Sequence, residues 1–161
     1  MSTTKADLAD GLRTVLREGN RVMAGFSADD WKKPALDADV EGWTRKQVYS
    51  HITALAEITP GFISGLAGAP EGTDGAAGLD INALNAQLVA SKEALSEQEL
   101  QGAFKTGFEN LIKFVEGMDE AQLAGYRKFG QLEGRLGDVM SGVLVLHCVS
   151  HIYNAGGSPL G

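Results

Sequence analysis

The sequence is poor in the residues that build covalent or cysteine-based frameworks. Its 161 residues include one cysteine, three histidines and four prolines. One cysteine excludes an intrachain disulfide framework and any zinc site made from several cysteines. Positive charge is also scarce, because 14 Lys and Arg residues stand against 21 Asp and Glu residues and leave a formal net charge of −7. Nucleic acids and anionic membranes require clustered cations, so we expect neither as a partner.

The sequence also lacks a recognisable targeting or membrane-spanning segment. Residues 1–8 contain Lys5 and Asp7 and no apolar block, so no signal peptide is predicted. The most apolar stretch, Val139–Ile152, includes two histidines, two serines and a glycine, and is too short and too polar to span a bilayer. We therefore predict a single cytoplasmic domain over residues 1–161.

Apolar residues recur at steps of three and four along most of the chain, which is the period of an amphipathic helix. This pattern predicts helices over residues 5–26, from residue 44 onward, over 80–117 with a break or kink at Ser96, and over 136–154. Residues 27–43 and 65–78 are predicted loops, and 118–137 are predicted to be irregular apart from a short extended piece at Tyr126–Phe129. The fold prediction is an all-α four-helix bundle with long connections.

Local signals mark where the predicted helices begin and end. Thr44 with Gln47, and Ser96 with Glu99, have the spacing of a capping box, and Asp80 can cap a third helix. Pro60 lies inside the second helical pattern and should kink or end that helix. The predicted inward stripe of the second helix consists of Val48, His51, Ile52, Leu55, Ile58 and Phe62.

The placement of the three histidines is the most informative feature of the sequence. His147 and His151 are four residues apart, which puts both side chains on one face of the last predicted helix. His51 can supply a third nitrogen if the second and last helices are neighbours. Three neutral imidazoles suit Zn(II), Ni(II), Fe(II) or Cu(II) and leave coordination positions open, as in catalytic sites. The alternative, that these histidines only pack in the core, stays open on the residues alone.

Two short blocks resemble a known superfamily. Residues 41–52 (EGWTRKQVYSHI) are similar to the pattern W-[ST]-x-x-[DE/Q]-h-x-x-H-h, with h apolar, that opens the second helix of DinB-like proteins. Residues 146–151 (LHCVSH) resemble the later H-x-x-x-H of the same superfamily, and the order of the two blocks also matches. The superfamily includes DNA-damage-inducible DinB proteins, bacillithiol transferases and the N-terminal domain of mycothiol-dependent maleylpyruvate isomerases.

The resemblance implies a bundle in which His51, His147 and His151 bind a divalent metal, zinc or nickel first among the candidates. It also implies a homodimer, and an enzyme that activates a low-molecular-weight thiol for transfer to a small electrophile. The chemistry is sound, because coordination to a cation stabilises the nucleophilic thiolate at neutral pH. Catalytic residues beyond the metal ligands, and residues that bind the thiol, are not predicted.

Two other functions remain open at this stage. One is a non-catalytic dimeric bundle that binds a small ligand in a cavity lined by the histidines, with the Gly- and Ala-rich loop Gly65–Gly78 as a lid. The other is a metal-dependent hydrolase at the same site, which would use activated water in place of a thiol.

Overall fold

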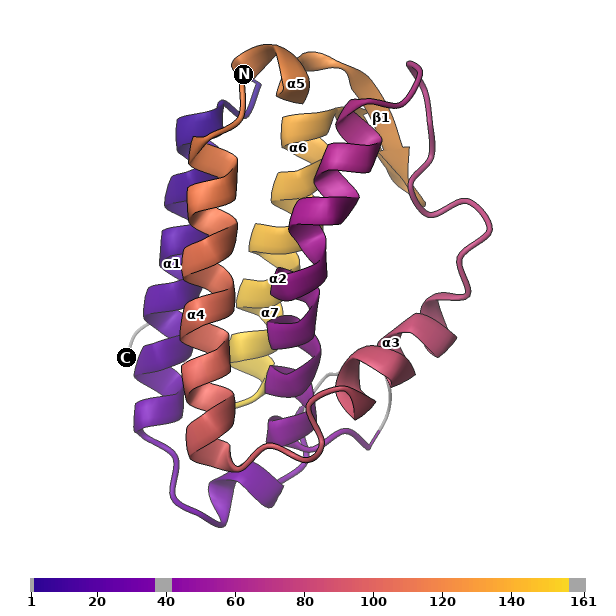
Figure 1. Ribbon diagram of the computed structural model, residues 1–161. Coiled ribbons are helices and arrows are strands. Elements are labelled where there is room, and N and C mark those ends of the chain that lie inside the picture. Colours follow the sequence, from indigo (N-terminus) through magenta and orange to yellow (C-terminus); the bar gives the residue numbers. More distant parts are fainter. Residues whose placement is uncertain (1, 37–41, 157–161) are drawn as a thin grey trace.

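Four long helical segments form the body of the molecule (Figure 1). They are α1 (Lys5–Ala24), α2 (Arg45–Ala67), α4 (Glu97–Glu116) and a C-terminal run made of α6 (Leu136–Met140), η2 (Ser141–Leu146) and α7 (His147–Asn154). Helix α4 packs against α1 and α2, and the C-terminal run packs against the same two helices. This computed structural model describes residues 2–36 and 42–156, so Glu41 of the first block lies outside the described residues. The predicted four-helix bundle is confirmed.

The helices begin where the capping signals place them. Thr44 Oγ1 accepts a hydrogen bond from the Gln47 backbone N–H at 3.2 Å, and Gln47 Oε1 accepts one from the Thr44 N–H at 2.8 Å. Ser96 and Glu99 make the same reciprocal pair. Asp80 Oδ1 accepts from the Ala83 N–H and caps α3 (Ile81–Ala90), a short helix that packs on α2 outside the bundle. The chain therefore breaks, and does not merely kink, between α3 and α4.

Pro60 does not end the second helix, which was one of its two predicted effects, because α2 continues to Ala67. In the turn before the proline, Thr59 Oγ1 donates a hydrogen bond to the Leu55 carbonyl oxygen at 2.6 Å. The inward stripe also needs one correction. Ile58 is 44% exposed, whereas Thr59 is buried in its place, because Ile58 borders an apolar hollow beside the bundle and not its core.

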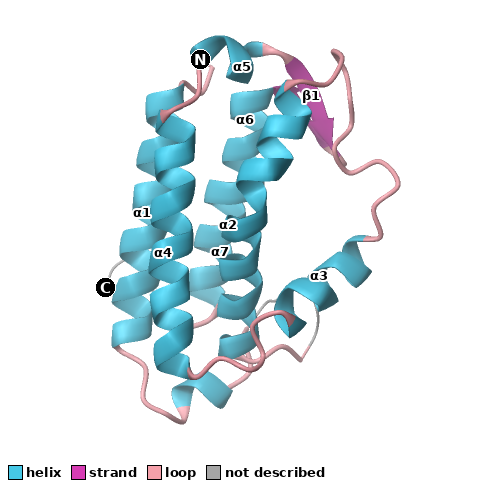
Figure 2. Cartoon of the chain, viewed as in Figure 1, coloured by secondary structure: helices cyan, strands magenta, loops and turns pink. Residues whose placement is uncertain are grey.

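Residues 118–137 are more regular than predicted. They form α5 (Glu120–Ala124) and an antiparallel hairpin of β1 (Tyr126–Phe129) and β2 (Leu132–Arg135), drawn in magenta in Figure 2. The predicted extended piece at Tyr126–Phe129 is β1. The predicted loop 27–43 likewise contains a short 3₁₀ helix, η1 (Asp30–Lys32), which buries Trp31. Contacts with residues far away in the sequence stabilise these short elements, and local periodicity does not predict such contacts.

Arg127 joins the hairpin to the end of α2. Its guanidinium is buried and donates hydrogen bonds to the carbonyl oxygens of Leu66, Ala67 and Ala69 at 2.6, 3.0 and 2.6 Å. Leu66 and Ala67 lie in the last turn of α2, where carbonyl oxygens lack their full set of intrahelical partners, and Ala69 lies just beyond the helix. A cation at this end also complements the helix dipole. Arg127 therefore fixes both the last turn of α2 and the position of β1.

The C-terminal run departs from a regular α-helix just before the histidine pair. Residues 141–146 form a π-helical stretch, in which the helix is wider than an α-helix. Such stretches are rare in proteins overall, but where they occur they are often at functional sites. By length and composition alone, Leu136–Asn154 is apolar enough to cross a membrane. It is packed as a core helix of the bundle, and eight of its residues are buried: Leu136, Gly137, Val139, Met140, Leu144, Cys148, His151 and Ile152.

Gly19 allows α1 and α4 to approach closely. A Cβ at this position would lie 2.2 Å from the ring tip of Phe104, which is fully buried. We expect Gly19→Ala to lower the free energy of unfolding by about 1–3 kcal/mol, because overpacking outweighs the helix propensity of alanine. Gly102→Ala in α4 is the control, since Gly102 is exposed and a Cβ added there would meet no atom within 4 Å. Urea denaturation measures both, and equal stability of the two variants would contradict the packing argument.

Candidate metal centre

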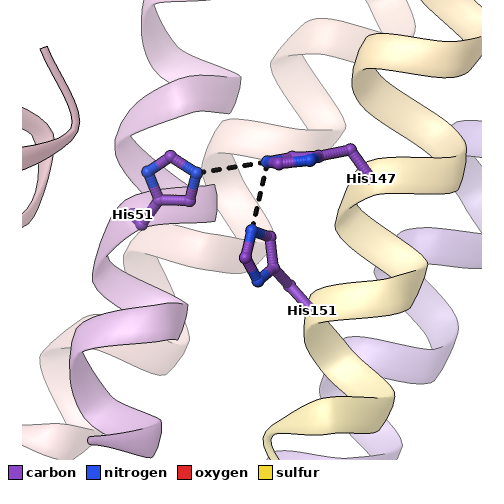
Figure 3. A group of neighbouring side chains, drawn as sticks. All are labelled: His51, His147 and His151. Atoms are coloured by element: carbon purple, nitrogen blue, oxygen red, sulfur yellow. Dashed lines mark hydrogen bonds between the residues drawn. The ribbon is translucent and has the colours of Figure 1, made fainter. Parts of the chain in front are cut away.

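The three histidines come together between α2 and α7, as Figure 3 shows. His51 Nε2 lies 3.4 Å from His147 Nε2, and His151 Nε2 lies 3.1 Å from the same atom. One ring nitrogen of each histidine lies within 4.8 Å of the corresponding nitrogens of the other two. The condition set by the sequence, that the second and last helices be neighbours, is met.

The spacing of the nitrogens fits one bound cation. Two nitrogens that each lie 2.0–2.1 Å from a tetrahedral ion are roughly 3.3 Å apart. The two observed distances of 3.4 and 3.1 Å bracket this value. The donor set also fits, because imidazole nitrogen is a preferred ligand of zinc, nickel and copper.

Hydrogen bonds among the three histidines cannot satisfy all the facing ring nitrogens at once. A neutral imidazole has one N–H and one acceptor nitrogen. His147 Nε2 faces two other Nε2 atoms, and it can pair well with one of them at a time. A cation placed between the rings would engage the lone pairs of all three nitrogens. His51 and His151 are 2% and 4% exposed, and His147 is half-buried, so the group is shielded from water on most sides.

Trp43 supports the ring of His51 and was not predicted as part of the site. The two ring centroids are 5.2 Å apart, and Trp43 is buried. The residue directly precedes the Thr44 cap of α2, so the helix start fixes its position relative to His51. That location, one residue before the capping box, is the signal that could have identified it.

An apolar pocket of about 210 Å³ opens beside two of the histidines. Its walls come from α2, α3, the hairpin, the π-helical stretch and the first residue of α7. They consist of His51, Leu55, Ile81, Leu84, Asn85, Leu88, Phe129, Leu132, Gly142, Val143 and His147. His151 does not line the pocket, so an ion held by the three rings would face the pocket on the side of His51 and His147. Asn85 was also missed, because residues 81–88 contain two asparagines and a glutamine, and nothing in the sequence singles out Asn85 among them.

The predicted lid takes a different position. Within the loop after α2, the backbone N–H groups of Gly72 and Gly75 donate to the carbonyl oxygens of Tyr126 and Lys128, each at 2.9 Å. These bonds hold the loop along β1, and none of its residues lines the pocket. Helix α3 covers the pocket instead.

The sequence profile of the mycothiol maleylpyruvate isomerase N-terminal domain family matches residues 12–151, which includes all three histidines. The chain belongs to this family. The family and the bundle together place it in the DinB-like superfamily that the two sequence blocks indicated. No curated protein matches the sequence significantly.

Solved structures share the fold of this family member at low sequence identity. A mycothiol-dependent maleylpyruvate isomerase superimposes with a TM-score of 0.72 at 15% identity, over 98% of this chain and 64% of that chain. YfiT from Bacillus subtilis, described as a probable metal-dependent hydrolase, gives 0.69 at 16% identity, over 94% of this chain and 83% of that chain. The colibactin self-resistance protein ClbS, solved with double-stranded DNA, gives a TM-score of 0.72 at 12% identity, over 96% of this chain and 94% of that chain. The chain thus spans less than two thirds of the isomerase's length.

Proposed function

We propose that this protein is a metal-dependent enzyme in which His51, His147 and His151 hold a divalent cation, zinc or nickel, and which transfers a low-molecular-weight thiol to a small electrophile. The observation that carries the proposal is the convergence of three imidazole nitrogens at the edge of an apolar pocket. A core packing role would not require the rings to meet nitrogen to nitrogen, nor to border an open cavity.

Each part of the site has a distinct task in this proposal. When bound, the cation would lower the pKa of a thiol at the site, so that the nucleophile is present as thiolate near neutral pH. Trp43 packs on His51 and restricts its ring orientation. The aliphatic walls, such as Leu55 and Val143, exclude water from the electrophile and so reduce competing hydrolysis.

The pocket walls favour a thiol over water as the nucleophile. No Asp or Glu is among the described residues that line the pocket, so no carboxylate is placed there as a general base. A free thiol has a pKa of about 8.5, far below that of water, and so needs much less activation. The hydrolase alternative shares the ligands, and its support is the fold shared with YfiT.

Metal content tests the first half of the proposal. We expect protein purified without a metal-binding tag to contain close to one equivalent of a divalent metal, or to take it up from added zinc or nickel, by mass spectrometry. Less than about 0.2 equivalents, with no uptake, would contradict metal binding.

Turnover with and without thiol tests the second half. We expect the metal-loaded protein to consume a model electrophile such as monobromobimane faster than the metal-free protein, and only when a small thiol is supplied. Product formation from water alone would favour the hydrolase. Metal binding without turnover in either assay would favour the non-catalytic ligand-binding module.

Assembly, partners and location remain predictions. The expected homodimer is tested by light scattering after gel filtration. The net charge of −7 still opposes nucleic-acid binding, even though ClbS shares the fold and was solved with DNA. A cytoplasmic location is consistent with a low-molecular-weight thiol as co-substrate.

A further inference from the structure

The polar group of Asn85 is the least expected feature of the pocket. Asn85 is 7% exposed, lies on α3 and lines the pocket that His51 and His147 also line. Its side-chain amide makes no hydrogen bond to any residue within 2–36 and 42–156. The polar atoms of this amide remain accessible from the pocket, so they are available to a molecule bound there. A bound molecule with a carbonyl, hydroxyl or amide group would supply that partner, since the amide both donates and accepts.

The rest of the pocket is uncharged. Among its described walls there is no Lys, Arg, Asp or Glu, and apart from Asn85 and the two histidines all the lining residues are apolar. In the absence of a metal on the histidines, a carboxylate bound there would lose its hydration without gaining a cationic partner, which is costly. The overall charge of −7 also disfavours anions.

The apolar surface extends beyond this pocket. A smaller hollow of about 50 Å³ shares four of the pocket's walls, so the two adjoin, and the shared residues are Leu55, Leu84, Phe129 and Val143. Four large apolar side chains that are 40–44% exposed border one or other of the two hollows: Ile58, Leu79, Ile81 and Leu132. A ligand that filled both hollows would cover apolar surface that now faces water.

From these observations we infer that the pocket binds an uncharged, elongated, mainly apolar molecule with one hydrogen-bonding group at Asn85. Its apolar tail lies in the adjoining hollow between α2, α3 and the C-terminal run. If the bound molecule is the electrophile, which rests on the proposed function, its reactive atom faces His51 and His147. This ligand class differs from the carboxylate that maleylpyruvate, named for the related isomerase, carries.

Three naphthalene derivatives of similar shape test the inference. They are 2-naphthamide, which is neutral and can pair with Asn85; 2-naphthoate, its anionic counterpart; and naphthalene, which has no polar group. Binding is measured by displacement of the neutral dye N-phenyl-1-naphthylamine from the full chain after metal removal, so a carboxylate–metal bond cannot contribute. We expect 2-naphthamide to bind at least about tenfold more tightly than 2-naphthoate, a difference of about 1.4 kcal/mol.

Substitution of the amide provides the residue-level test. Asn85→Leu should weaken the binding of 2-naphthamide by about tenfold and leave the affinity for naphthalene unchanged or higher. Asn82 is exposed on the same helix, so Asn82→Leu is the matched control and should change neither of the two binding affinities. Circular dichroism confirms that each variant is folded.

Equal binding of the amide and the carboxylate, no effect of Asn85→Leu on 2-naphthamide, or no binding of any of the three compounds would overturn the inference. Because these measurements need no metal, they can succeed even if the protein proves to bind none. In that case the thiol-transfer proposal fails and the ligand class stands.

Discussion

Replacing His51 by alanine is expected to reduce zinc affinity by more than about 100-fold, because loss of a residue that merely supports a ligand already costs 10–100-fold. His51 is the one ligand contributed by α2, and its Nε2 lies 3.4 Å from that of His147. Without it, the pair on α7 can still bind weakly, since His147 and His151 remain four residues apart. Zinc competition against a chelating dye measures the change.

The bundle should remain folded in this variant. His51 occupies one position in the inward stripe of α2, where its neighbours Val48 and Ile52 are fully buried and unchanged by the substitution. Thr53→Ala is the matched control, because Thr53 is also fully buried on α2 and its hydroxyl has no hydrogen-bond partner among the described residues. Wild-type zinc affinity in a folded His51→Ala protein would show that this ring is not a ligand.

Arg127→Met should cause the largest loss of stability, about 3 kcal/mol or more. The substitution keeps much of the side-chain volume and removes the guanidinium that bonds to three carbonyl oxygens of Leu66, Ala67 and Ala69. Those oxygens would then need water at the junction of α2 and β1, where Arg127 is only 5% exposed. Urea denaturation provides the free energy of unfolding.

Two further variants separate charge from geometry. Arg127→Lys keeps the positive charge and loses the planar set of donors, so its stability should fall between those of wild type and Arg127→Met. Arg17→Met removes an exposed arginine from α1 and should leave stability unchanged. If Arg127→Met proved as stable as Arg17→Met, the guanidinium would not hold the end of α2.

The sequence predicts best what local chemistry decides. The starts of α2, α3 and α4 follow from side chains that bond to the backbone three residues away, as with Thr44 and Gln47. The histidine cluster was also accessible, because helical spacing alone aligns His147 with His151. The proximity of His51 required one assumption, that two particular helices are neighbours.

What the sequence leaves out depends on distant contacts. Arg127 bonds to residues about 60 positions earlier, and these bonds hold the last turn of α2, beyond Pro60, and fix the hairpin. The π-helical stretch before His147 leaves no simple periodic signature. The pocket, with Asn85 in its wall, exists only once α3 has folded back onto α2. The Gly65–Gly78 loop consequently looked like a lid in the sequence and proved to be held along β1.

A crystal structure of the zinc-soaked protein, with anomalous data collected at the zinc edge, tests the central proposal most directly. We predict one anomalous peak about 2.0–2.1 Å from the Nε2 atoms of His51, His147 and His151, open toward the pocket on the side of His51 and His147. Zinc bound only at surface carboxylates, or rings that turn away from one another around an empty centre, would contradict it.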